Sequence, residues 1–93
     1  MRPWEELRYV VKHYLIGDYD TNTFSDIYYE IYVHKMYHYQ FTEAEKVALD
    51  KLLTVSSRYS PYLEDRKTGI YFTEEEVRKQ AKVVNELISK SEK

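Results

Sequence analysis

The segment FTEAE at residues 41–45 recurs as FTEEE at residues 72–76, and this pair constrains the fold more than any other local feature. In each copy the threonine can cap a helix N-terminus and the glutamate three residues later can bond back to it, which makes a capping box. The phenylalanine before each threonine suits a hydrophobic staple. Shared capping chemistry does not establish a structural repeat. It predicts two amphipathic helices that start at about residues 43 and 74.

Apolar residues recur at helical spacing after both copies and in two segments before them. Four helices are therefore expected, at about residues 3–16, 21–38, 43–59 and 74–90. Pro3 suits a first helical position and Gly17 the residue just past a helix end. Pro61 disfavours helical geometry at Ser60, which ends the third helix. We expect an all-α fold, a single domain over residues 1–93 arranged as an antiparallel four-helix bundle.

Eleven tyrosines stand where a small helical protein usually has aliphatic bulk. Three of them fall on the inward stripes of the expected helices and are predicted to be core: Tyr14, Tyr28 and Tyr32. Four others do not fit those stripes: Tyr29, Tyr37, Tyr39 and Tyr62. Exposed tyrosine beside acid is a composition typical of protein interfaces. The alternative is that these four are scattered surface residues in a protein short of aliphatic side chains.

The charge distribution is more informative than the net charge of −2, which disfavours a general nucleic-acid binder. From His13 to His34 the chain has no lysine or arginine and carries four acids: Asp18, Asp20, Asp26 and Glu30. The absence of cysteine excludes disulfides and thiolate metal sites, and fits a reduced, cytoplasmic setting. No apolar stretch approaches 18 residues, so we predict neither a signal peptide nor a membrane span.

Catalytic and metal-binding chemistry finds little support in the residue pattern. His34 and His38, four residues apart, could share a zinc ion on one helix face, but no third ligand is evident. The carboxylate pairs Asp18 and Asp20, or Glu64 and Asp65, read more simply as a helix cap and a solvated turn. The serines at residues 54–60 lack a glycine-flanked nucleophile with histidine and aspartate partners. We expect no enzymatic activity, no metal and no cofactor.

A helix-turn-helix DNA reader is a further alternative for a small helical domain. The last helix has suitable cations and an amide in Arg78, Lys79, Gln80 and Lys82. Three glutamates, residues 74–76, occupy its N-terminal turn, where a duplex would approach, and they would repel it. The cations are therefore expected to form a solvated face.

The segment SSRYSPYLED at residues 56–65 combines a helix end in small residues with an arginine, an aromatic, a proline and nearby acids. It is followed by YFTEEEVRKQAKVV and preceded by YLIGDYDTNTFSDIYYEIY, which has an apolar helix end, a polar turn and a helix opening with Phe-Ser-acid. In pattern and order, over roughly residues 7–88, the chain resembles the colicin D immunity family of bacterial self-protection proteins.

The resemblance implies a four-helix bundle that binds the nuclease domain of a toxin, in the type case a tRNA-cleaving one. Members block the basic substrate cleft with acidic residues that stand in for RNA phosphates. The expected partner is thus a cognate toxin nuclease domain, with no nucleic acid bound. The alternative is a small helical adaptor or regulatory domain that is unrelated to toxins. A DNA-binding regulator is the third and least favoured interpretation.

The resemblance also implies where the toxin would bind. The family's inhibitory acids cluster at the end of the third helix and in the turn after it, where this chain has serine or tyrosine at three such positions: Ser57, Ser60 and Tyr62. Glu64 and Asp65 remain as acids of that turn, with Asp26 and Glu30 as support from the second helix. The expected toxin-binding residues are therefore Ser57, Ser60, Tyr62, Glu64, Asp65, Asp26 and Glu30.

Overall fold

The fold is all-α, as the sequence predicts. The computed structural model describes residues 2–60, 62 and 71–91. Within these residues the chain forms four α-helices and one π-helical segment, and it has no β-strand. The elements are α1 (Pro3–Leu15), α2 (Thr21–Tyr29), η1 (Glu30–Lys35), α3 (Glu43–Ser57) and α5 (Glu74–Ser89).

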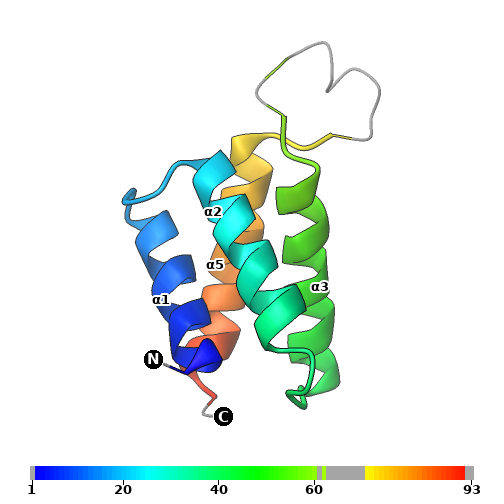
Figure 1. Ribbon diagram of the computed structural model, residues 1–93. Helices are drawn as coiled ribbons and strands as arrows, with labels where there is room; N and C mark the ends of the chain where they lie inside the picture. The colour runs from blue at the N-terminus through cyan, green and yellow to red at the C-terminus, as the bar shows by residue number, and fades with distance from the viewer. Residues whose placement is uncertain (1, 61, 63–70, 92–93) are drawn as a thin grey trace.

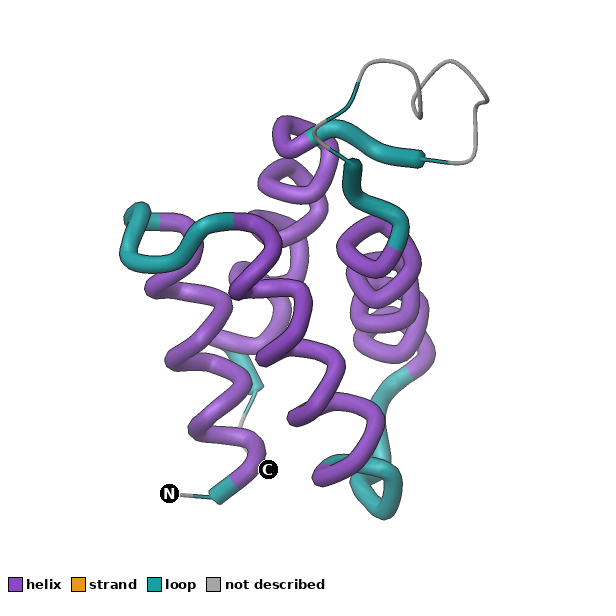
Figure 2. The backbone as a smooth tube through the Cα atoms, turned by 45° about the horizontal axis from the view of Figure 1, so that its top comes forward, coloured by secondary structure: helices purple, strands orange, loops and turns teal. Residues whose placement is uncertain are grey.

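The helices pack in a ring. Each one contacts the next along the chain, and α5 closes the ring against both α3 and α1. In Figure 1, α1 and α3 run upward while α2 and α5 run downward. Figure 2, in which the top of the molecule is turned toward the viewer, shows the same helices around a common centre. The polar turn after α1 and the end of α3 lie at one end of the ring, and the turn between η1 and α3 lies at the other.

The helices α2, α3 and α5 each begin at a residue whose side chain caps the helix. Thr42 and Thr73 form complete capping boxes at α3 and α5, with Glu45 and Glu76 as the reciprocal partners. At α2 the carboxylate of Asp20 accepts the N–H of Thr23 at 2.7 Å. The caps fix where three helices enter the ring, and so which of their faces point inward.

The core is built from the stripes that the helical spacing predicts, and it is rich in aromatic rings. Tyr14 and Phe24 stack with ring centroids 4.1 Å apart, and Phe24, Tyr28 and Tyr32 follow one another along α2 and η1. Several apolar residues of the helices are only partly buried at the edge of the core: Leu15, Ile27, Leu53 and Leu87. Phe41 and Phe72, the predicted staple residues, also pack partly buried against the core.

The second helix is shorter and less regular than the predicted span of residues 21–38. It changes to π geometry at Glu30 and ends at Lys35. Met36 leaves helical geometry with φ at −117°, yet only 1% of it is exposed. The chain turns at this point, and the N–H of Tyr39 bonds the Met36 carbonyl at 3.0 Å.

The third helix also ends early, at Ser57 rather than near residue 59. The reason is an isolated parallel bridge between Tyr59 and Phe72. Phe72 donates to the carbonyl of Arg58 at 2.8 Å, and Ser60 donates to that of Phe72 at 3.1 Å. These backbone bonds draw the chain out of helical geometry before Pro61 is reached. They also hold together the two ends of the long connection between α3 and α5.

None of the helices in the described part of the chain is long and apolar enough to cross a bilayer.

Candidate partner-binding surface

A groove of about 430 Å³ lies between α1 and the continuous helix formed by α2 and η1. We call it the α1–α2 groove. Its lining residues are Glu6, Tyr9, Val10, Asp26, Ile27, Glu30, Ile31 and Lys35. Val10 and Ile31 are buried and Ile27 is partly buried, so the groove has an apolar floor. Tyr9 is 46% exposed and adds an aromatic wall.

The charged residues of the α1–α2 groove are mostly acidic. Lys35 Nζ lies 3.2 Å from Glu6 Oε2, an ion pair that joins η1 to α1 at the groove. Asp26 and Glu30 are exposed, and within the described part of the chain neither forms an ion pair. They stand four residues apart on one helix face, where two like charges repel. A cation from a partner would relieve that repulsion and pair with both.

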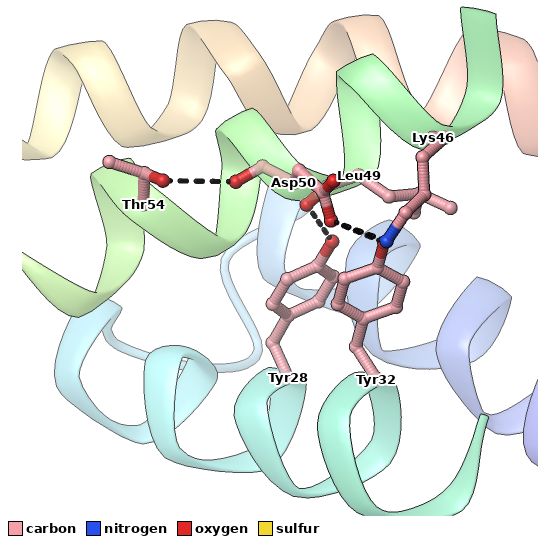
Figure 3. A network of polar contacts seen from close by, with 6 residues as sticks. All are labelled: Tyr28, Tyr32, Lys46, Leu49, Asp50 and Thr54. Carbon is pink, nitrogen blue, oxygen red and sulfur yellow. Dashed lines mark hydrogen bonds and ion pairs between the residues drawn. The ribbon is translucent and has the colours of Figure 1, made fainter. Parts of the chain in front are cut away.

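The direction in which Asp26 and Glu30 point follows from how the opposite face of the same helix is anchored. Figure 3 shows Tyr28 and Tyr32 reaching from this helix to α3. Tyr28 Oη donates to the carbonyl of Leu49 at 2.7 Å, and Tyr32 Oη donates to Asp50 Oδ1 at 2.6 Å. Two residues of α-helix turn a side chain through about 200°. Fixing the two tyrosines against α3 therefore turns the two acids away from it.

The anchor is a connected polar network around Asp50. Lys46 Nζ donates both to Asp50 Oδ1 at 3.1 Å and to Tyr32 Oη at 3.3 Å, and Thr54 Oγ1 donates to the Asp50 carbonyl at 3.1 Å (Figure 3). Burial raises the pKa of the Tyr28 hydroxyl well above its usual value. Burial, the hydrogen bond to Asp50 and the charge of Asp50 raise the pKa of Tyr32. Both hydroxyls thus remain protonated donors at neutral pH.

The predicted toxin-binding residues divide into two places. Asp26 and Glu30 line the α1–α2 groove, whereas Ser57, Ser60 and Tyr62 are not among its residues and belong to the end of α3 and the segment after it. Ser57 is exposed, and Tyr62 is 70% exposed. Glu64 and Asp65 lie outside the described residues.

Ser60, another predicted toxin-binding residue, is only 5% exposed. The bridge between Tyr59 and Phe72 holds its backbone, and its side-chain oxygen accepts the N–H of Tyr62 at 3.2 Å. Ser60 thus shapes the exit of the chain from α3, and it presents little of its side chain to a partner.

Four groove residues were not predicted from the sequence: Glu6, Tyr9, Val10 and Lys35. Glu6 and Tyr9 are three residues apart on α1 and lie off its inward stripe, so a partly polar face was visible in the sequence. Lys35 gave no such signal, because its pairing with Glu6 spans 29 positions of the chain.

The four tyrosines off the inward stripes have different surroundings. Tyr29, Tyr37 and Tyr62 are exposed, with 46%, 81% and 70% of their surfaces accessible. Tyr39 is partly buried against the core and stacks near Phe41. Three of the four are thus available to a partner, and one is structural.

Among the cations of α5, Arg78 is held by contacts within the protein. Arg78 is partly buried, its Nη1 donates to the Tyr14 carbonyl at 3.2 Å, and its guanidinium lies 4.6 Å from the centre of the Tyr14 ring. Glu74 is 3.6 Å from the same guanidinium. Arg78 therefore ties α5 to α1, and it is held away from the extended position that base contact in a DNA groove requires.

His34 and His38 are both exposed, and the ring of His34 meets the edge of Tyr29. No group of three or more histidine, aspartate or glutamate residues that could hold a metal ion occurs among the described residues.

No protein-family model matches the chain, and comparisons with curated proteins and with solved structures find no match either.

Proposed function

We propose that this protein is an immunity protein, which binds a bacterial toxin and neutralises it without catalysing a reaction. The observation that carries the proposal is the pair Asp26 and Glu30, which are exposed on one helix face at an apolar groove and have no ion-pair partner among the described residues. Such a surface suits a protein partner whose own surface is basic. The fold proposed with this function is an antiparallel four-helix bundle, which the alternating directions of the helices in Figure 1 support.

The proposed partner is the nuclease domain of the toxin, most simply an RNase. Its substrate cleft must carry lysine and arginine to hold phosphates, and these side chains accept carboxylates in place of phosphate. Asp26 and Glu30 would pair with such cations, while the floor formed by Val10, Ile27 and Ile31 would take an apolar neighbour. Opposite potentials would also speed the encounter, which matters when free toxin kills the cell that makes it.

The end of α3 forms the second part of the proposed toxin-binding surface. Ser57 and Tyr62 are exposed there and can supply a hydroxyl and an aromatic ring. Glu64 and Asp65 follow in the chain and would add acidic charge. In this proposal the protein acts in the cytoplasm, needs no cofactor or metal, and binds neither nucleic acid nor membrane.

The test uses the purified protein and the toxin nuclease domain that the proposal expects the neighbouring gene to encode. Cleavage of RNA by that domain should fall to background when the two proteins are mixed in equal amounts. A matched control is the same domain mixed with an unrelated small acidic helical protein, which should leave cleavage unchanged. Full cleavage in the presence of excess protein would contradict the proposal.

A helical adaptor that binds another basic protein is the second candidate. The same α1–α2 groove favours it, because an apolar floor beside two acids does not by itself select a nuclease. The identity of the neighbouring gene distinguishes the immunity protein from the adaptor. A gene for the C-terminal part of a large secreted toxin supports the immunity proposal, and an unrelated gene supports the adaptor.

A further inference from the structure

A second apolar surface lies on α3 and α5, on the side of the helix ring opposite the α1–α2 groove. We call it the α3–α5 face; it is lined by Glu43, Ala44, Val47, Ala48, Lys51, Gln80, Val83 and Leu87. Val47 is 62% exposed and Val83 is 43% exposed. These exposed valines on two adjacent helices form an apolar surface that a partner can cover.

The two charged residues that line the α3–α5 face are spaced evenly on either side of Val47 along α3. Glu43, Val47 and Lys51 follow one another at intervals of four residues, so they form one line along α3. Each charge lies about 6 Å along the helix axis from Val47, on opposite sides of it. Both charged side chains are exposed, and among the described residues neither has an ion-pair partner.

This arrangement is complementary to itself. A two-fold axis through Val47 places two copies of α3 antiparallel, with Val47 of one copy against Val47 of the other. The same rotation brings Glu43 of each copy to Lys51 of the other, which makes two equivalent ion pairs around an apolar centre. An isologous interface of this kind is the commonest way in which soluble proteins form dimers.

We propose that the α3–α5 face binds a second copy of this chain, giving a two-fold dimer centred on Val47. The charge pattern selects this occupant over an unrelated helix, because the surface supplies both halves of its own ion pairs. The dimer leaves both α1–α2 grooves free, since they lie on the outer sides of the pair. The inference stands apart from the proposed function and does not depend on any toxin.

Charge reversal gives the test, with sedimentation equilibrium of the full chain as the measurement. Glu43→Lys and Lys51→Glu each turn two attractive pairs into two repulsive ones, so either variant alone should dimerise at least about tenfold more weakly than wild type. An equimolar mixture of the two variants restores both attractive pairs. The mixture should therefore form a heterodimer within about threefold of the wild-type dissociation constant.

The matched control is Glu75→Lys, which reverses an exposed acid in the first turn of α5 as Glu43→Lys does in α3. It should dimerise like wild type, and circular dichroism should show the same helicity for all variants. A wild type that stays monomeric to millimolar concentration would overturn the proposal. Charge-reversal variants that dimerise as tightly as wild type would also overturn it. So would an equimolar mixture of the two variants whose dissociation constant is no lower than that of either variant alone. If Val47→Glu weakened toxin binding in a monomeric wild type, the face would belong to the toxin and the proposal would fall.

Discussion

The hydroxyl of Tyr32 donates a hydrogen bond of 2.6 Å to the carboxylate of Asp50, and this bond joins the helix that carries the acidic groove to α3. Lys46 meets both atoms from the solvent side, with its ammonium 5.6 Å from the centre of the Tyr32 ring. Tyr32 lies in the π-helical segment, and only 7% of it is exposed. The orientation of Glu30 therefore depends on an interaction made by its neighbour two positions on.

Tyr32→Phe removes that bond while keeping the ring. The free energy of unfolding should fall by about 1–2 kcal/mol, because Asp50 loses a donor and retains only Lys46. Urea denaturation measures the change. Tyr37→Phe is the matched control, since Tyr37 is 81% exposed and its loss of a hydroxyl should leave stability unchanged. Equal effects of the two substitutions would show that the Asp50 network does not contribute.

High pH should destabilise the protein through Tyr28 and Tyr32. Their pKa values are raised in the folded chain, so they contribute stability that is fully present below the ordinary tyrosine pKa of about 10. Above that value the unfolded chain releases protons that the folded chain retains, and the free energy of unfolding falls. The loss should begin near pH 10 and continue as the pH rises further, and it should be shallower in a variant that combines Tyr28→Phe with Tyr32→Phe. Parallel curves would contradict this assignment.

Low pH should act through Asp20. Hydrogen bonds from Thr23 to its carboxylate lower its pKa, so its contribution to stability is present above the unfolded value and is lost as the pH falls. Asp20→Asn keeps an oxygen that can accept the Thr23 N–H but cannot titrate. Thermal unfolding of this variant should depend less on pH in the acid range than that of wild type. An unchanged pH dependence would exclude the cap as its source.

The capping boxes give a prediction in which the chain supplies its own control. Thr73→Ala removes the acceptor for the Glu76 N–H at the start of α5 and should cost about 1 kcal/mol. Thr54→Ala makes the same chemical change at an exposed position inside α3, where the hydroxyl bonds only the Asp50 carbonyl one turn earlier and alanine is the better helix former. It should be neutral within a few tenths of a kcal/mol. Chemical denaturation of both variants shows whether the loss of stability comes from the missing helix cap or from replacing any threonine by alanine.

Local chemistry made most of the helices predictable from the sequence. The starts of α3 and α5 follow from two capping boxes, and Phe24, Tyr28 and Tyr32 lie inward because their spacing places them on one stripe. The ends of α2 and α3 depend on distant partners. The backbone bonds of Phe72 to Arg58 and Ser60 draw the chain out of α3, and no local pattern indicates that pairing.

The candidate site was predictable only in part for the same reason. Asp26 and Glu30 stood out because the surrounding stretch has no lysine or arginine. That they share a groove with Tyr9 depends on how α1 packs against α2, which spacing along the chain does not specify. The burial of Ser60 likewise follows from a tertiary bridge, so its position in the chain alone suggested a surface that the fold does not give it.

The most direct test of the central claim measures the rate at which the protein associates with its toxin nuclease domain, at low and at raised salt. The double variant Asp26→Lys with Glu30→Lys should associate about tenfold or more slowly than wild type at low salt. Raised salt should slow the association of wild type and reduce the difference in rate between the two proteins. Glu86→Lys is the control, because Glu86 is exposed on α5 and is not among the residues of the groove. Its effect should be small. Equal rates for the groove variant and the control, unchanged by salt, would contradict the claim that the acids of the α1–α2 groove capture the toxin.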